Sequence, residues 1–88
     1  MKNPLNFAIL KYFTTVDEAC AEDVVEALKG EYGNFRHLNK KAVFEALMTG
    51  QTNGFLAETH YEMVDGELKI YFHAPPEGKE TINKYIPN

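Results

Sequence analysis

The dipeptide Asp65–Gly66 constrains the fold of this chain more than any other feature of its sequence. Asp-Gly between alternating apolar and polar residues is typical of a two-residue type I′ turn, because both turn positions need positive φ and glycine adopts it at little steric cost. Such a turn also fixes which residues face each other across a β-hairpin over residues 56–74. The predicted cross-strand pairs are Val64–Glu67, Met63–Leu68, Glu62–Lys69, Tyr61–Ile70, His60–Tyr71 and Thr59–Phe72.

Side chains alternate between the two faces of a strand, so this register predicts one core face and one solvent face for the hairpin. The predicted core face is apolar and carries Tyr61, Met63, Leu68, Ile70 and Phe72. The predicted solvent face carries His60, Glu62, Lys69, Tyr71 and His73. A slip of one residue would mix the two sets, and the agreement between turn and pattern therefore favours this register.

Two helices are predicted in the first third of the chain. Apolar residues at helical spacing predict a helix over residues 4–14, with Asn3 as its cap and the following proline at its first position. A second helix is predicted over residues 17–30. Its start is open, because Thr15 to Glu18 fits a capping box while a start near Ala21 fits the apolar pattern as well.

Two further helices flank the hairpin in the sequence. A helix over residues 40–50 is predicted to be capped by Asn39, and the glycines after it end it. Pro75 and Pro76 cannot supply amides to a strand, so they end the hairpin. A last helix is then predicted over residues 77–86, with its apolar residues on one face.

Length and composition indicate one ordinary folded domain. The 88 residues are enough for one hydrophobic core, so we predict a single domain over residues 1–88. Cys20 is the only cysteine, which excludes an intrachain disulfide, and its place on an apolar helix face predicts a buried core residue. No apolar run approaches the roughly 20 residues that cross a bilayer, and no signal-peptide pattern opens the chain. These features favour a cytoplasmic protein.

The sequence contains no motif that predicts catalysis. A glycine-rich phosphate loop, a nucleophile elbow and an HExxH sequence are all missing from it. His60 and His73 share the predicted solvent face, but a functional metal site needs at least three convergent ligands. We therefore expect neither an enzyme nor a cofactor or metal site.

Charge is segregated along the chain, although its net value is −4. Acidic residues crowd the segment 17–31, where Lys29 is the only cation. The segment FRHLNKK follows, with no acid among its basic residues Arg36, His37, Lys40 and Lys41. The net charge argues against indiscriminate attraction to nucleic acid, whereas the second segment predicts a local basic patch. Both runs also fit solvated helix faces that keep the protein soluble.

Three helices, a hairpin and a closing helix, in this order, resemble the winged helix-turn-helix domains of MarR-like and PadR-like transcription regulators. The segment VFEALMTGQTNGFL resembles the recognition helix and the glycine before the first wing strand. The segment YFHAPPEGKETINKYI is similar to the second wing strand and the family passage after it, with Tyr71, Ala74, Gly78 and Ile82 in comparable places. The resemblance covers essentially the whole chain and implies an α+β fold, a winged helix built from a three-helix bundle, a β-hairpin wing and a C-terminal helix.

By the logic of that family, the third helix enters the major groove of duplex DNA and the wing contacts phosphates or the minor groove. The resemblance thus implies a transcriptional regulator whose DNA contacts come from Arg36, His37, Lys40, Lys41 and Lys69. The exposed face predicted for the third helix, however, offers bases few donors, because it carries Lys41, Ala42, Glu45, Ala46 and Thr49. The alternative is a winged-helix module that binds a protein and no DNA.

The first and last helices carry apolar residues that need a partner. Phe7 and Leu10 lie off the main stripe of the first helix, and Ile82, Tyr85 and Ile86 share a face of the last. Terminal helices form the dimer interface in many winged-helix regulators, so these five residues are the predicted interface of a homodimer. Alternatively, the last helix folds back and covers Phe7 and Leu10 within one chain.

Overall fold

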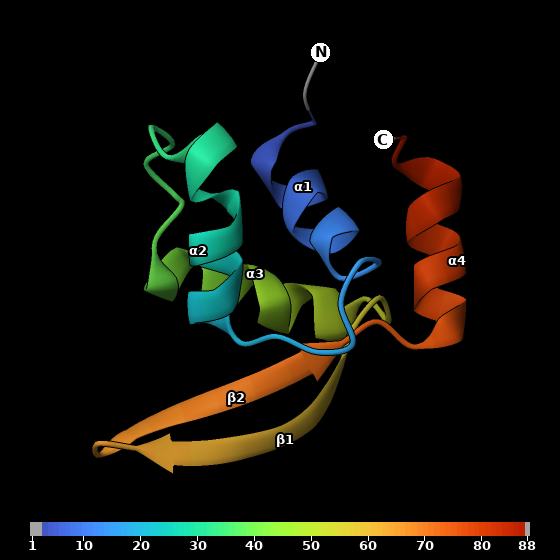
Figure 1. The fold of residues 1–88 in the computed structure, drawn as a ribbon. Coiled ribbons are helices and arrows are strands. Elements are labelled where there is room, and N and C mark those ends of the chain that lie inside the picture. Colours follow the sequence, from blue (N-terminus) through green and yellow to red (C-terminus); the bar gives the residue numbers. More distant parts are fainter. Residues whose placement is uncertain (1–2, 88) are drawn as a thin grey trace.

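Four helices and a two-stranded antiparallel hairpin make up residues 3–87, the part of the chain that this computed structural model describes. In chain order they are α1 (Leu5–Tyr12), α2 (Ala21–Tyr32), α3 (Lys40–Thr52), β1 (Ala57–Val64), β2 (Glu67–His73) and α4 (Pro76–Tyr85). In Figure 1, α1 stands between α2 and α4, α3 crosses beneath all three, and the hairpin projects from the helices below α3. None of the helices within residues 3–87 is long and apolar enough to cross a membrane.

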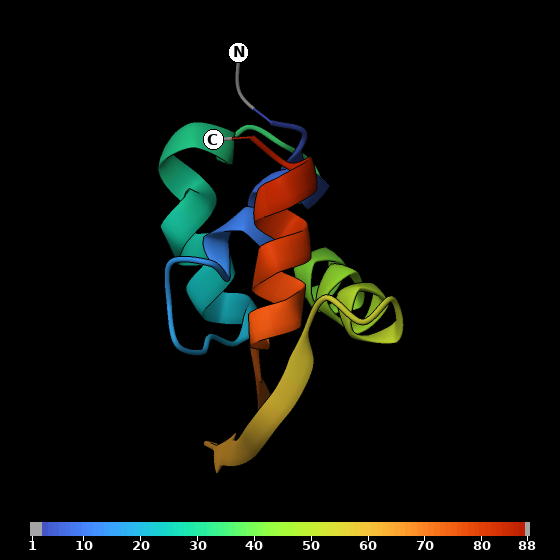
Figure 2. The same cartoon turned by 90° about the vertical axis from the view of Figure 1, so that its right-hand side faces the viewer.

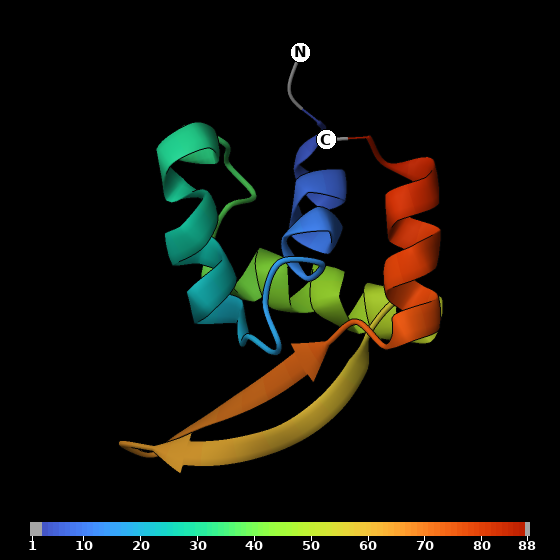
Figure 3. The same cartoon turned by 45° about the vertical axis from the view of Figure 1, so that its right-hand side comes forward.

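The core lies where the helices meet the base of the hairpin. The four helices and β2 contribute to it, and its largest fully buried side chains are Tyr32, Phe13, Phe72, Leu47, Ile82, Val24 and Val43. Figures 2 and 3 show α4 standing alongside α1, and Figure 3 shows it on the side of α1 away from α2. The Lys11 ammonium joins the two helices, donating to Asn83 Oδ1 and to the Ile86 carbonyl, both at 2.8 Å.

The capping prediction holds for α3 and is wrong for α1. Asn39 Oδ1 accepts a hydrogen bond from the Ala42 amide at 2.9 Å, as an N-cap side chain does. By contrast, Pro4 occupies the cap position of α1 and no side chain caps that helix. The Asn3 amide group instead donates to the Pro87 carbonyl at 3.0 Å, so Asn3 ties the two ends of the described chain together.

The second helix begins at Ala21, so the alternative start near Ala21 is confirmed and the start at residue 17 is wrong. The Thr15 hydroxyl caps no amide there, because it donates to the Tyr12 carbonyl at the end of α1. Ala19 then exchanges two backbone hydrogen bonds with Phe72, of 3.0 and 2.9 Å. That pairing needs extended backbone, so the helix starts only after Cys20, whose amide bonds Asp23 Oδ2 at 3.1 Å.

The predicted turn and most of the predicted register are confirmed. Asp65 and Gly66 have φ of 51° and 81°, the two positive values of a type I′ turn. Five of the six predicted pairs occur, from Val64–Glu67 to His60–Tyr71. The sixth is wrong, because Glu58 and not Thr59 pairs with Phe72 and a β-bulge intervenes. A bulge bends its strand, and β1 curves visibly in Figure 3.

The predicted core face of the hairpin is buried only at its base. Phe72 is fully buried and its ring meets that of Phe44 edge to face, with centroids 6.3 Å apart. Further out the prediction is wrong, since Tyr61, Met63 and Leu68 are 66%, 64% and 52% exposed. The reason is geometric: the hairpin extends past the helices, which therefore leave these three side chains largely uncovered (Figure 1).

Candidate nucleic-acid interface

The amino end of α3 gathers most of the predicted DNA contacts. Asn39 fixes the turn before the helix, because its side-chain amide donates to the Arg36 carbonyl at 3.1 Å while its oxygen caps α3. Arg36 and His37 are exposed in this turn, and Lys41 is exposed in the first turn of the helix. Within the described residues, Arg36 and Lys41 make no ion pair, so both cations are available to an anion.

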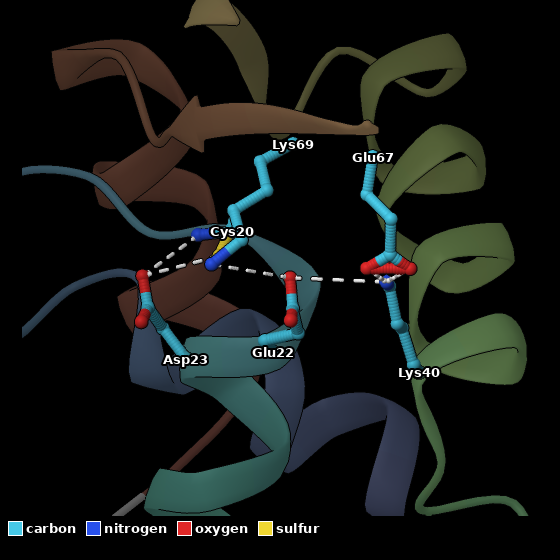
Figure 4. A network of polar contacts seen from close by, with 6 residues as sticks. All are labelled: Cys20, Glu22, Asp23, Lys40, Glu67 and Lys69. Atoms are coloured by element: carbon cyan, nitrogen blue, oxygen red, sulfur yellow. Dashed lines mark hydrogen bonds and ion pairs between the residues drawn. The ribbon is translucent and has the colours of Figure 1, made fainter. Parts of the chain in front are cut away.

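Lys40 and Lys69 are held by carboxylates. Lys40 Nζ lies 3.1 and 3.2 Å from the two carboxylate oxygens of Glu67, which follows the wing turn. Glu22 Oε1 lies 4.0 Å from Lys40 Nζ and 3.7 Å from Lys69 Nζ. Figure 4 shows Glu22 of α2 standing between the two lysines. The hydrogen bond to Glu67 is the largest of the influences that raise the pKa of Lys40 above its ordinary value, so this lysine stays charged.

The outward face of α3 offers few groups that could donate to base edges. Lys41, Glu45 and Thr49 are exposed along it. The Thr49 hydroxyl donates to the Glu45 carbonyl of its own helix at 3.0 Å, and the Thr52 hydroxyl bonds the Met48 carbonyl in the same way. Lys41 is therefore the strongest donor on this face.

A ring stack and an acidic contact shape the base of the hairpin. His60 stacks on Tyr71, with centroids 4.6 Å apart and planes 6° from parallel. Its two ring nitrogens lie 3.4 Å from Glu18 and 3.5 Å from Glu62. Glu18 also accepts from the hydroxyl of Thr59, the extra residue of the bulge, at 3.0 Å. In residues 3–87 no group of three or more His, Cys, Asp or Glu side chains could hold a metal ion.

An open groove of about 670 Å³ runs between α1 and α3. Its walls are mainly apolar, and Arg36 and His37 line it on the side of the α2–α3 turn. Phe7, 46% exposed, and the half-buried Leu10 also line this groove.

Among the residues predicted for a dimer interface, Tyr85 is the most exposed, whereas Ile82 and Ile86 are buried in the core of their own chain. Ile82 of α4 and Ile86, which follows that helix, are thus buried within the chain, whereas Phe7 of α1 stays largely exposed.

The sequence analysis missed the two carboxylates that organise the basic residues. Glu67 lies 27 positions from Lys40 along the chain and Glu22 lies on another helix, so no local spacing links them. Their contacts join Lys40 of α3 to Lys69 of β2. Lys41 lies near both lysines, lining a smaller pocket of about 360 Å³ with them. Whether these cations contact DNA stays a prediction.

Comparisons with known proteins give one clear result. No protein-family model matches the sequence, and no curated protein matches it. Among solved structures, the chain is similar to Bacillus subtilis PadR, in a crystal structure with operator DNA, with a TM-score of 0.73 over 96% of this chain. The fold is a winged helix. At 19% sequence identity the likeness concerns the fold, and the match spans 47% of the PadR chain.

The predicted α+β architecture, a winged helix, is confirmed. The three helices α1, α2 and α3 form the bundle, and the hairpin of β1 and β2 is the wing. The pairing of Ala19 with Phe72 adds an isolated antiparallel bridge on the edge of β2. Helix α4 closes the domain against α1.

Proposed function

We propose that this chain binds duplex DNA as a non-enzymatic transcriptional regulator, with α3 in the major groove and the wing on the DNA backbone. The observation that carries the proposal is the likeness of 96% of the chain to a PadR structure that contains operator DNA. The exposed cations Arg36 and Lys41 at the amino end of α3 support it, because that end of a recognition helix meets the duplex first. His37 is exposed beside them.

The test is a fluorescence anisotropy titration against labelled duplexes, including the DNA upstream of the protein's own gene, at several salt concentrations. Each phosphate contact contributes about −0.9 to the slope of log affinity against log salt. Contacts from Arg36 and Lys41 alone would give a slope of about −2, and added contacts from Lys40 and Lys69 would give nearly −4. Tighter binding to one duplex than to a scrambled one would identify a sequence-specific regulator.

A pair of variants separates specific contacts from general charge. Arg36→Ala/Lys41→Ala should lose most of the binding while the unfolding transition stays in place, because both side chains are exposed. The matched control is Lys79→Ala/Lys84→Ala, which removes two cations from α4, away from the amino end of α3 (Figure 1). Equal losses in the two proteins, or no binding to any duplex at low salt, would remove the support for DNA binding.

A second candidate function, a protein-interaction module, is favoured by one observation. The outer wing exposes Tyr61, Met63 and Leu68 on one face, and monomeric proteins rarely display such contiguous apolar surface without use for it. In that case the folded chain would bind no duplex at low salt. Replacing these three residues with serine would then abolish capture of the protein partner and leave the helical core folded.

A further inference from the structure

Four charged side chains form one network where α2, α3 and the wing meet (Figure 4). Glu67 holds Lys40 through both carboxylate oxygens, at 3.1 and 3.2 Å. Glu22 lies between Lys40 and Lys69, 4.0 and 3.7 Å from their ammonium nitrogens. Two positive and two negative charges thus cancel within a few ångströms of each other.

The two lysines of this network occupy the places where a winged helix meets the DNA backbone. Lys40 is the first residue of α3, and Lys69 lies on the second wing strand. A DNA phosphate that approached either lysine would find a carboxylate already bound to it. Arg36 and Lys41 differ, since neither has a carboxylate partner within residues 3–87.

Carboxylate and phosphate make the same kind of charge-assisted hydrogen bond to an ammonium group, so they compete for it. The side chains of Lys40, Glu67 and Glu22 are 47%, 59% and 39% exposed, and exposed ion pairs are weak. Lys69 is less accessible, at 26% exposed, but its distance of 3.7 Å from Glu22 is longer than that of a close ion pair. An exchange of partners is therefore accessible. The carboxylates stay nearby after the exchange, however, and their charge repels the phosphate that replaced them.

We propose that Glu22 and Glu67 compete with DNA phosphates for Lys40 and Lys69 and so weaken the sequence-independent part of duplex binding. This inference rests on the proposed DNA-binding function. Phosphate contacts position a protein on the duplex and carry no sequence information. The competition therefore acts equally on every duplex and leaves discrimination to contacts with the bases.

The first experiment compares wild type with Glu67→Gln by anisotropy on two unrelated duplexes over a salt series. The variant should bind both duplexes about two- to fivefold more tightly, the factor that corresponds to an exposed ion pair. Its salt slope should steepen by up to about 0.9, because one lysine is freed for a phosphate. Glu26→Gln is the matched control: it removes the same charge from the exposed pair with Lys29, 3.4 Å apart on α2, and should change neither quantity.

A second pair of proteins tests whether the gain passes through Lys40. In a Lys40→Gln background, Glu67→Gln should give little or no further tightening. A gain of the same size in that background would overturn the proposal, because Glu67 would then act by general repulsion. A gain confined to one duplex sequence, or one equalled by Glu26→Gln, would overturn it as well.

The outcomes also separate this proposal from the one on which it rests. If wild type binds duplex DNA and Glu67→Gln binds no better, only the competition is refuted. If wild type, Glu67→Gln and Glu22→Gln/Glu67→Gln all fail to bind at low salt while remaining folded, DNA binding and competition fall together. If wild type does not bind duplex DNA at low salt and Glu22→Gln/Glu67→Gln does, both proposals are supported.

Discussion

Gly78, in the first turns of α4, lies directly against the backbone carbonyl of Phe55, which precedes the first wing strand. A β-carbon at position 78 would overlap the Phe55 carbonyl oxygen, and backbone cannot move aside as a flexible side chain can. We predict that Gly78→Ala destabilises the protein by about 1–3 kcal/mol, as overpacking does in cores. Urea unfolding monitored by circular dichroism measures this change in free energy.

The chain supplies its own control for that substitution. Gly30 also lies inside a helix, but nothing stands within 4 Å of the place where its β-carbon would be. Alanine is the better helix former by roughly 1 kcal/mol, so Gly30→Ala should stabilise the protein. Opposite signs for the two variants are expected, and a stabilised Gly78→Ala would show that α4 does not sit against Phe55.

The hairpin shows what the sequence could and could not predict. The register of the two strands could be predicted, because the type I′ turn at Asp65–Gly66 depends only on neighbouring residues and sets the cross-strand pairs. The burial of one face did not follow, because burial depends on what packs against a strand. The alternation of apolar and polar residues distinguishes the two faces of the hairpin. How far along the hairpin the helices cover one face depends on how the whole domain is assembled.

Two leucines test that distinction directly. Leu47 is fully buried in α3 and Leu68 is 52% exposed on the wing, although both belong to apolar patterns in the sequence. Leu47→Ala should cost about 2–5 kcal/mol through lost burial and a cavity. Leu68→Ala should cost no more than about 0.5 kcal/mol. Comparable losses in urea unfolding would mean that the outer wing packs on something in solution.

The site was less predictable than the fold for a related reason. Arg36, His37, Lys40 and Lys41 were predicted as a basic group because they cluster in the sequence, and they do lie together at the amino end of α3, which Asn39 caps. The partners of Lys40 come from other elements, and their contacts depend on how the wing leans toward α3. Local patterns likewise left two starts open for α2, and the long-range pairing of Ala19 with Phe72 favours the one near Ala21 over the capping box that begins at Thr15.

Stability should fall as the pH rises above about 9. Burial is the largest cause that raises the pKa of Cys20 above its ordinary 9.0, and burial likewise raises the pKa values of Tyr12, Tyr32 and Tyr71. The folded state therefore holds these protons more tightly than the unfolded state, which ionises first and gains free energy as the pH increases. The raised pKa of Lys40 acts in the same direction, since its favourable contact with Glu67 is lost on deprotonation.

Denaturant unfolding at a series of pH values from about 7 to 10 measures this effect, the range in which thiols and phenols begin to ionise. Cys20→Ala removes the thiol and should flatten the decline near pH 9, whatever packing it loses at neutral pH. A decline of the same steepness in both proteins would assign it to the tyrosines and Lys40.

The predicted homodimer can be tested at exposed positions alone. Phe7 and Tyr85 are 46% and 70% exposed on α1 and α4, so glutamate at either place should barely affect the folded monomer. We predict that Phe7→Glu and Tyr85→Glu convert a dimer into monomers in sedimentation equilibrium. Tyr61→Glu, a similar change on the wing, should leave the mass unchanged. A monomeric wild type, or a dimer that tolerates both helix variants, would refute the predicted interface.

Two substitutions at position 39 distinguish a change in the stability of α3 from a change in the charge at its amino end. Asparagine and aspartate cap helices about equally well, and a negative charge near a helix amino end is favourable. Asn39→Asp should therefore keep the Ala42 amide bonded and the protein as stable as wild type, while it places a carboxylate beside Lys40 and Lys41. Asn39→Ala should lose about 1 kcal/mol of stability without adding charge. If α3 contacts DNA, anisotropy should show that Asn39→Asp binds the duplex more weakly than wild type, although its free energy of unfolding is unchanged. An Asn39→Asp protein that binds as tightly as wild type would mean that the DNA lies elsewhere on the protein.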